Sequence, residues 1–172
     1  MNSSIDDLIR DCIERWKRRS TDDCRDLLER LQKNELTDII SALSPYATHP
    51  EAETRRLVPW LLADLNQQAA AVSAAIDGLR DPEPWVRQNA CGILCNFRDP
   101  AAVPALIEAI LNDTSADVRV DACHALGAIR DGRAIPALQW VAENDHALNW
   151  EDCPVSSYAE AYIKLIQEPS GS

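Results

Sequence analysis

Two stretches of the chain, PWVRQNACGILCNFRDPAAVPAL at residues 84–106 and ADVRVDACHALGAIRDGRAIPAL at residues 116–138, decide the fold. A shift of 32 positions places the first stretch on the second, with identical residues at many of the paired positions. An internal repeat of this length is typical of a solenoid, in which each unit packs only on its neighbours. The identical pairs include Val86 with Val118, Arg87 with Arg119, Ala90 with Ala122, Cys91 with Cys123, Leu94 with Leu126, Arg98 with Arg130, Asp99 with Asp131, Pro104 with Pro136 and Leu106 with Leu138.

Each copy predicts two helices joined by a short turn. The first helix of each copy carries apolar residues at relative positions 0, 4, 7, 8 and 11, which lie on one face of an α-helix. An Asp-Pro or Asp-Gly dipeptide follows and indicates the turn, and a second apolar helix comes after it. The apolar positions are Val86, Ala90, Ile93, Leu94 and Phe97 in one copy, and Val118, Ala122, Ala125, Leu126 and Ile129 in the other.

The repeat extends beyond these two copies. Asp81, Asp113 and Asp145 recur at the same interval, and Arg55 falls on Arg87 when the shift is applied towards the N-terminus. We therefore expect units at 50–81, 82–113 and 114–145 and a terminal half-unit at 146–172. Residues 1–49 are helical but not repetitive, and the segment PYATHP separates them from the array. The predicted fold is all-α, a short α–α superhelix with an N-terminal helical cap, packed as one domain.

The sequence also predicts a helix cap, the effects of two prolines and a set of hydrogen bonds between units. Ser4 and Asp7 stand in the spacing of a capping box before the first apolar stripe. Pro45 is expected to end the third helix, and Pro59 to interrupt the fourth. The recurring arginines, Arg87 and Arg119, are expected to form a ladder of hydrogen bonds with the acidic turns at Asp81, Asp113 or Asp117.

The charge of the chain narrows the class of partner. The net charge is −11, and residues after position 50 contain nine basic and 18 acidic residues. Such a surface repels nucleic acids and anionic membranes and attracts basic proteins. The sequence has no apolar run long enough to cross a membrane and no secretion signal, so we expect a cytoplasmic protein with reduced cysteines.

The motif VRxxACxxL, followed by an Ile/Phe-Arg-Asp turn and a V/I-P-A-L helix, resembles the HEAT-like repeats of the phycobilisome-lyase type. The resemblance covers residues 82–145, is weaker over 50–81 and is absent before residue 50. It implies an armadillo-like superhelix whose second helices line the concave face. It does not imply lyase activity, because a fold of this kind supports scaffolds, adaptors and enzymes.

Only one group of residues suggests metal chemistry. Cys91 and Cys95 lie four residues apart on one predicted helix, and Cys123 and His124 lie on its repeat equivalent. The preferred interpretation is that these cysteines are small apolar core residues. The common catalytic and nucleotide-binding motifs are absent from the sequence. We therefore expect no catalytic residues, no metal and no cofactor.

Positions that differ between units are the candidates for binding. Stacking the second helices gives one column of Ile76, Glu108 and Trp140, and an adjacent column of Arg80, Asn112 and Asn144. A tryptophan off the core stripe is typical of an interface anchor. An alternative is that residues 146–154, with Trp150, fold over Trp140.

These observations predict a non-catalytic module that binds a basic protein or peptide along an acidic concave face, with Trp140 as the central contact. One alternative, implied by the resemblance, is a bilin-lyase-type subunit or chaperone that holds a tetrapyrrole in the groove. Another is a surface for self-association.

Overall fold

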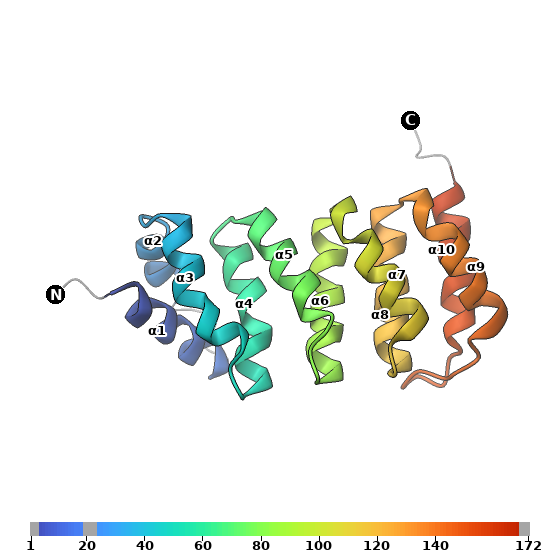
Figure 1. Ribbon diagram of the computed structural model, residues 1–172, viewed down its shortest axis with the longest axis horizontal. Coiled ribbons are helices and arrows are strands. Elements are labelled where there is room, and N and C mark those ends of the chain that lie inside the picture. The colour runs from blue at the N-terminus through green and yellow to red at the C-terminus, as the bar shows by residue number, and fades with distance from the viewer. Residues whose placement is uncertain (1–3, 19–23, 169–172) are drawn as a thin grey trace. The chain divides into compact units, whose positions relative to one another are not determined.

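The computed structural model describes residues 4–18 and 24–168. Within these ranges the chain forms α-helices and two short 3₁₀ helices, with no strand, which confirms the all-α prediction. In chain order the elements are α1 (Ile5–Lys17), α2 (Arg25–Leu31), α3 (Leu36–Ala47), α4 (Ala52–Asp64), α5 (Gln68–Gly78), α6 (Pro84–Phe97), η1 (Pro100–Ala102), α7 (Val103–Asn112), α8 (Ala116–Ile129), η2 (Gly132–Ala134), α9 (Ile135–Asn144) and α10 (Val155–Gln167), as labelled in Figure 1.

Packing contacts divide the chain into two compact units, Met1–Ala71 and Val72–Ser172. In the first unit α1 packs on α2, α3 and α4, and α3 packs on α4. The division falls inside α5, whereas the sequence suggested a boundary at residue 49. The assignment of the repeat units and their packing as one domain stay predictions.

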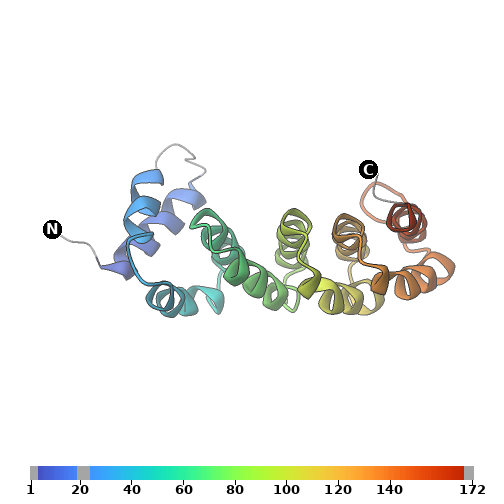
Figure 2. The same ribbon diagram turned by 90° about the horizontal axis from the view of Figure 1, so that it is seen from above.

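The second unit is built from two rows of helices (Figure 2). Helices α6, α8 and α10 form one row, in which α8 contacts both of its neighbours, and α7 and α9 lie side by side in the other. The two helices predicted for each copy of the repeat are present, as α6 and α7 in the first copy and α8 and α9 in the second. The apolar stripes of the repeat face the interior, where the buried members are Val86, Ala90, Ile93, Leu94, Val118, Ala122, Ala125 and Leu126.

The recurring arginines join successive loops of the second unit. The guanidinium of Arg87 donates two hydrogen bonds to the carboxylate of Asp113, at 2.6 and 2.8 Å, and a third to the backbone oxygen of Asp81 at 2.9 Å. Arg119 repeats the pattern with the Asp145 carboxylate, at 2.6 and 3.1 Å, and with the Asp113 backbone oxygen at 2.7 Å. Each arginine thus links the loop before its own helix to the equivalent loop one repeat later.

The arginine ladder differs from the prediction in its partners. Asp113 is a partner as expected, but Arg119 pairs with Asp145, which the sequence had marked only as a unit boundary. Asp117 instead accepts a hydrogen bond from the backbone N–H of Trp150, at 2.8 Å. The first unit contains part of the same pattern, because Arg55 donates to the backbone oxygens of His49 and Pro50 at 2.8 and 3.0 Å.

The N-terminal capping box is confirmed, whereas the two proline predictions are wrong. The Ser4 hydroxyl accepts from the backbone N–H of Asp7 at 3.1 Å, and the Asp7 carboxylate accepts from that of Ser4 at 3.3 Å. Helix α3 continues past Pro45 and helix α4 continues through Pro59. A proline removes one helical hydrogen bond but has a helical φ, so burial of the helix face can outweigh its cost. Pro59 itself is buried.

Candidate functional site

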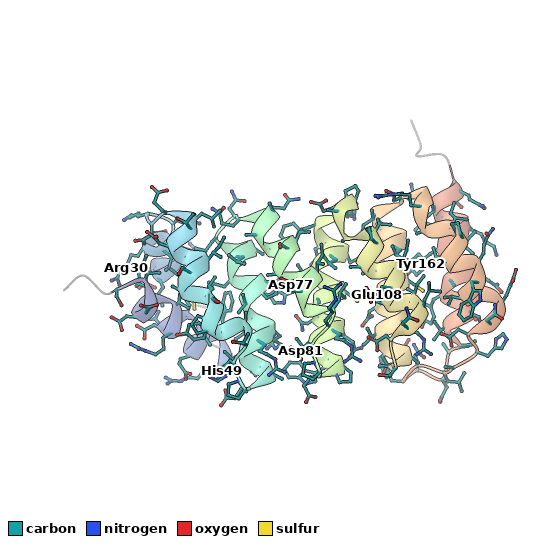
Figure 3. All side chains as sticks on the ribbon, viewed as in Figure 1. Arg30, His49, Asp77, Asp81, Glu108 and Tyr162 are labelled. Atoms are coloured by element: carbon teal, nitrogen blue, oxygen red, sulfur yellow. The ribbon has the colours of Figure 1, made fainter. Side chains whose placement is uncertain are left out.

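A groove of about 290 Å³ opens between the C-terminal part of α5 and helix α7, entirely within the second unit. Helix α5 and the turn that follows it contribute an apolar wall and one cation, Arg80. Helix α7 contributes small and polar side chains spaced one turn apart. Figure 3 labels Glu108 on α7 and Asp81 in the loop after α5. The lining residues are Ile76, Leu79, Arg80, Asp81, Arg87, Ala105, Glu108, Ala109, Asn112, Asp113 and Thr114.

Four of the six residues predicted for binding line this groove. They are the first two members of each predicted column: Ile76 and Glu108, and Arg80 and Asn112. The structure also joins the two columns, because a guanidinium nitrogen of Arg80 lies 3.6 Å from a carboxylate oxygen of Glu108. Both side chains are about two-thirds exposed, at 66% and 64%. An ion pair this open to water contributes about 0–1 kcal/mol to the stability of the fold, so a charged group of a partner can replace either member.

The inner end of the groove is held by the buried pair of Arg87 and Asp113. Their side chains are only 10% and 6% exposed, and the carboxylate of Asp113 also accepts from the backbone N–H of Ser115 at 2.8 Å. The hydrogen bonds that Arg87 donates to the Asp113 carboxylate raise the pKa of Arg87 above its ordinary value. This pair is a fixed part of the scaffold, whereas Arg80 and Glu108 are exchangeable.

The remaining two predicted residues, Trp140 and Asn144, lie on α9. They stand 32 positions after Glu108 and Asn112, so they occupy on α9 the places that line the groove on α7. Helices α7 and α9 are in contact, and the face that begins at the groove therefore continues onto α9.

Trp140 is exposed on this face, with 52% of its surface open to solvent. Residues 146–154 do not cover it. That segment turns back on itself through a bridge between Leu148 and Pro154 and attaches to α8 at Asp117. The side-chain amide of Asn144 donates to the backbone oxygen of Trp140 at 2.8 Å.

Sequence reasoning missed the apolar floor of the groove. Leu79 is buried at the end of α5, and Ala105 and Ala109 lie three residues before and one residue after Glu108 on α7. The helical spacing around Glu108 was the available signal, because residues three or four apart share one face. The columns were drawn from repeat equivalence alone, and that comparison does not include neighbours along the same helix.

The cysteines considered for metal binding are held as thiols. Cys91 and Cys123 are fully buried, and burial raises the pKa of Cys123 to about 12 and that of Cys91 above its ordinary value. A metal ligand must be a thiolate, which these surroundings disfavour. The ring of His124 lies against Tyr162, with centroids 5.1 Å apart. Within residues 4–18 and 24–168, no three histidine, cysteine or acidic side chains are grouped so as to hold a metal ion.

Comparison with known families agrees with this geometry. The family model of HEAT repeats matches residues 72–149. This segment is similar to HEAT repeats. HEAT repeats generally form scaffolds that mediate protein–protein interactions rather than enzymes. The match begins where the second compact unit begins and contains all six residues of the two predicted columns. A search of curated proteins found no match to the chain.

In the part of the chain that the structure describes, no helix is both long and apolar enough to cross a membrane. The phycobilisome-lyase subtype, the cytoplasmic location and the lack of catalytic activity stay predictions.

Proposed function

We propose that the HEAT repeats bind a protein or peptide of basic character across the face formed by the end of α5, α7 and α9. The observation that carries this proposal is the groove beside α7 with exposed Trp140 at the equivalent place on α9. A large, exposed aromatic side chain on the helix beside a groove is the kind of anchor that dominates binding energies at interfaces.

The charges of this face allow a cation of a basic partner to replace Arg80 beside Glu108. Glu108 is paired with the exposed Arg80, and a lysine or arginine of the partner can take that place. Residues 72–172 contain seven basic and 15 acidic residues, so the unit as a whole attracts cations over a distance. Two of the seven, Arg87 and Arg119, are already committed to buried carboxylates.

The polar residues at the edge of the face fit a peptide main chain. Asn112 and Asn144 each carry a side-chain amide, and they recur one repeat apart. One amide N–H of Asn144 already donates to the Trp140 carbonyl, so Asn144 offers a partner its amide oxygen and its second N–H. Both asparagines are exposed, so they can bind backbone groups of an extended segment while Trp140 and Ile76 contact its side chains. The face lies on packed helices, which lowers the ordering cost of binding.

The test begins with peptides selected from a random library on the full chain. We expect Trp140→Ala to weaken the selected peptides by about thirtyfold, the loss of about 2 kcal/mol that is typical of an anchor residue. Gln139→Ala, at the neighbouring exposed position of α9, is the matched control and should change affinity less than twofold. Affinity is measured by isothermal titration calorimetry, with circular dichroism to check folding.

The partner's basic character is tested by salt and by Glu108→Gln. Raising the salt concentration should lower affinity for the wild type more steeply than for the Glu108→Gln protein. Unchanged affinity of a folded Trp140→Ala protein contradicts the site. The tetrapyrrole alternative is checked by visible absorbance of a bilin titrated with the chain, where a saturable spectral shift would favour it.

A further inference from the structure

The loop between α9 and α10, residues 145–154, displays the most exposed large apolar side chain among the described residues. Trp150 is 78% exposed and Leu148, two positions earlier, is 57% exposed. We call residues 145–154 the Trp150 loop. A tryptophan can bury about 150–250 Å² of surface, and Trp150 uses little of it in the fold, so most of its ring is available to a partner.

The Trp150 loop is rigidly built around a buried asparagine. The side-chain oxygen of Asn149 accepts from the backbone N–H groups of Glu151 and Cys153, at 3.1 and 2.9 Å, and its amide nitrogen donates to the Tyr158 hydroxyl at 3.2 Å. The Asn149 residue is buried, unlike its exposed neighbours. This network fixes the turn from inside and leaves Trp150 at its outer side.

Two further contacts hold the base and the tip of the loop. At the base, the backbone N–H of Val155 donates to the oxygen of Ala147 at 3.0 Å, beside the bridge between Leu148 and Pro154. At the tip, the backbone N–H of Trp150 donates to the carboxylate of Asp117 on α8 at 2.8 Å. The main chain of Trp150 is therefore positioned before any partner arrives, and little ordering entropy is lost when its indole is bound.

The charges around Trp150 select the chemistry of that partner. The Trp150 loop contains Asp145, Glu151 and Asp152 and no lysine or arginine. Asp145 is already paired with Arg119. Glu151 accepts a hydrogen bond from the neutral Tyr158 hydroxyl at 3.2 Å, which leaves its negative charge in place, and both Glu151 and Asp152 are exposed directly after Trp150. A second copy of this acidic chain is disfavoured here, because its net charge of −11 repels the same carboxylates.

We propose that the Trp150 loop is a second docking site for a lysine- or arginine-rich segment of a partner protein. It is different from the face formed by the end of α5, α7 and α9, which carries Trp140. The partner's cation lies over the face of the Trp150 indole, where the ring's electrons attract it. Glu151 and Asp152 bind the same or a neighbouring cation, and Leu148 contacts the apolar stem of its side chain.

The test uses the full ¹⁵N-labelled chain and the indole N–H signals of its five tryptophans. Trp150→Phe and Trp140→Phe assign the two relevant signals, so each surface is read separately and failure of one proposal is distinguishable from failure of the other. The probes are a deca-arginine peptide and a deca-glutamate peptide. We expect deca-arginine to shift the Trp150 signal saturably and deca-glutamate to leave it unchanged.

The charge contribution is measured with matched variants. Glu151→Gln with Asp152→Asn should weaken deca-arginine binding at the Trp150 signal at least fivefold. The control, Glu160→Gln with Glu168→Gln, removes the same charge from two exposed positions, one in α10 and one directly after it. It should change the affinity for deca-arginine, read at the Trp150 signal, less than twofold. If the double variant does not fold, Asp152→Asn alone is used, because asparagine suits the positive φ of 57° at that position.

Three results overturn the proposal. The first is a Trp150 signal that deca-arginine does not move. The second is equal weakening by the two double variants, which indicates attraction to net charge alone. The third is a Trp150 signal that shifts on dilution of the protein without peptide, which identifies a second copy of the chain as the occupant.

Discussion

At the scale of the residue, burial in the core is expected to protect the cysteine thiols from alkylation, in a way that depends on pH. Burial raises the pKa of the Cys123 thiol to about 12, so at pH 8 it stays protonated and unreactive. We expect iodoacetamide at pH 8 to label half-buried Cys153 in the folded protein and to spare Cys123 until urea unfolds the chain. Mass spectrometry of the digested protein measures both sites, and labelling of Cys123 as fast as Cys153 would contradict the packing.

Two arginines take a backbone conformation that suits glycine. Arg98 and Arg130 end α6 and α8 with φ of 53° and 57°, and each donates its backbone N–H to a carbonyl of the preceding turn. We expect Arg98→Gly to raise the free energy of unfolding by about 0.5–1 kcal/mol, because relief of the left-handed strain exceeds the entropy that glycine adds to the unfolded chain. Urea denaturation measures it. Arg98→Ala, which removes the side chain but keeps Cβ, should give no gain.

At the scale of the element, the spacing between α8 and α10 depends on a missing side chain. A Cβ placed on Gly127 of α8 would lie 2.1 Å from a ring carbon of Tyr162 on α10. We expect Gly127→Ala to destabilise the protein by about 1–3 kcal/mol through overpacking. Gly92, inside α6 with open space around it, is the control, and Gly92→Ala should stabilise by about 0.5–1 kcal/mol. Thermal melts of the two variants measure these changes in stability. Equal changes for Gly127→Ala and Gly92→Ala would contradict the close approach of Tyr162 to Gly127.

The links between loops are another property of the elements. Asp113→Asn leaves the buried guanidinium of Arg87 without its counter-charge, and we expect a loss of about 3 kcal/mol. Glu108→Gln breaks only the exposed pair with Arg80 and should cost less than about 1 kcal/mol. Both values come from urea denaturation. Similar costs for the two variants would mean that Arg87 finds another acceptor.

At the scale of the whole molecule, the excess of acidic residues opposes folding. The net charge of −11 repels itself in the compact state, and salt screens that repulsion. We expect the melting temperature to rise by about 2–4 °C between 20 and 300 mM potassium chloride, the change that about 1 kcal/mol produces in a chain of this size. Differential scanning calorimetry measures it, and a fall with salt would indicate that attractive ion pairs dominate.

The sequence by itself determined the repeat and its elements. Residues such as Val86, Leu94, Val118 and Leu126 recur because each unit must bury the same stripe, and such a period is visible without any structure. The capping box at Ser4 was equally legible, because its contacts span only three residues. The columns of residues that differ between units also follow from the period, and four of their members, Ile76, Arg80, Glu108 and Asn112, line the groove.

Only the tertiary structure decided which of these residues are exposed and which are paired. Arg119 pairs with Asp145, 26 residues away, and a periodic pattern cannot choose among several acidic turns. Pro45 and Pro59 stay within helices because packing, which is non-local, outweighs their local preference. Trp140 and Trp150 are both open to solvent because a loop built around Asn149 turns towards α8, and that direction depends on contacts 33 residues apart. The residue pattern that forms each helix is local and repeats along the chain. The exposure of a side chain depends on whether a distant segment packs over it.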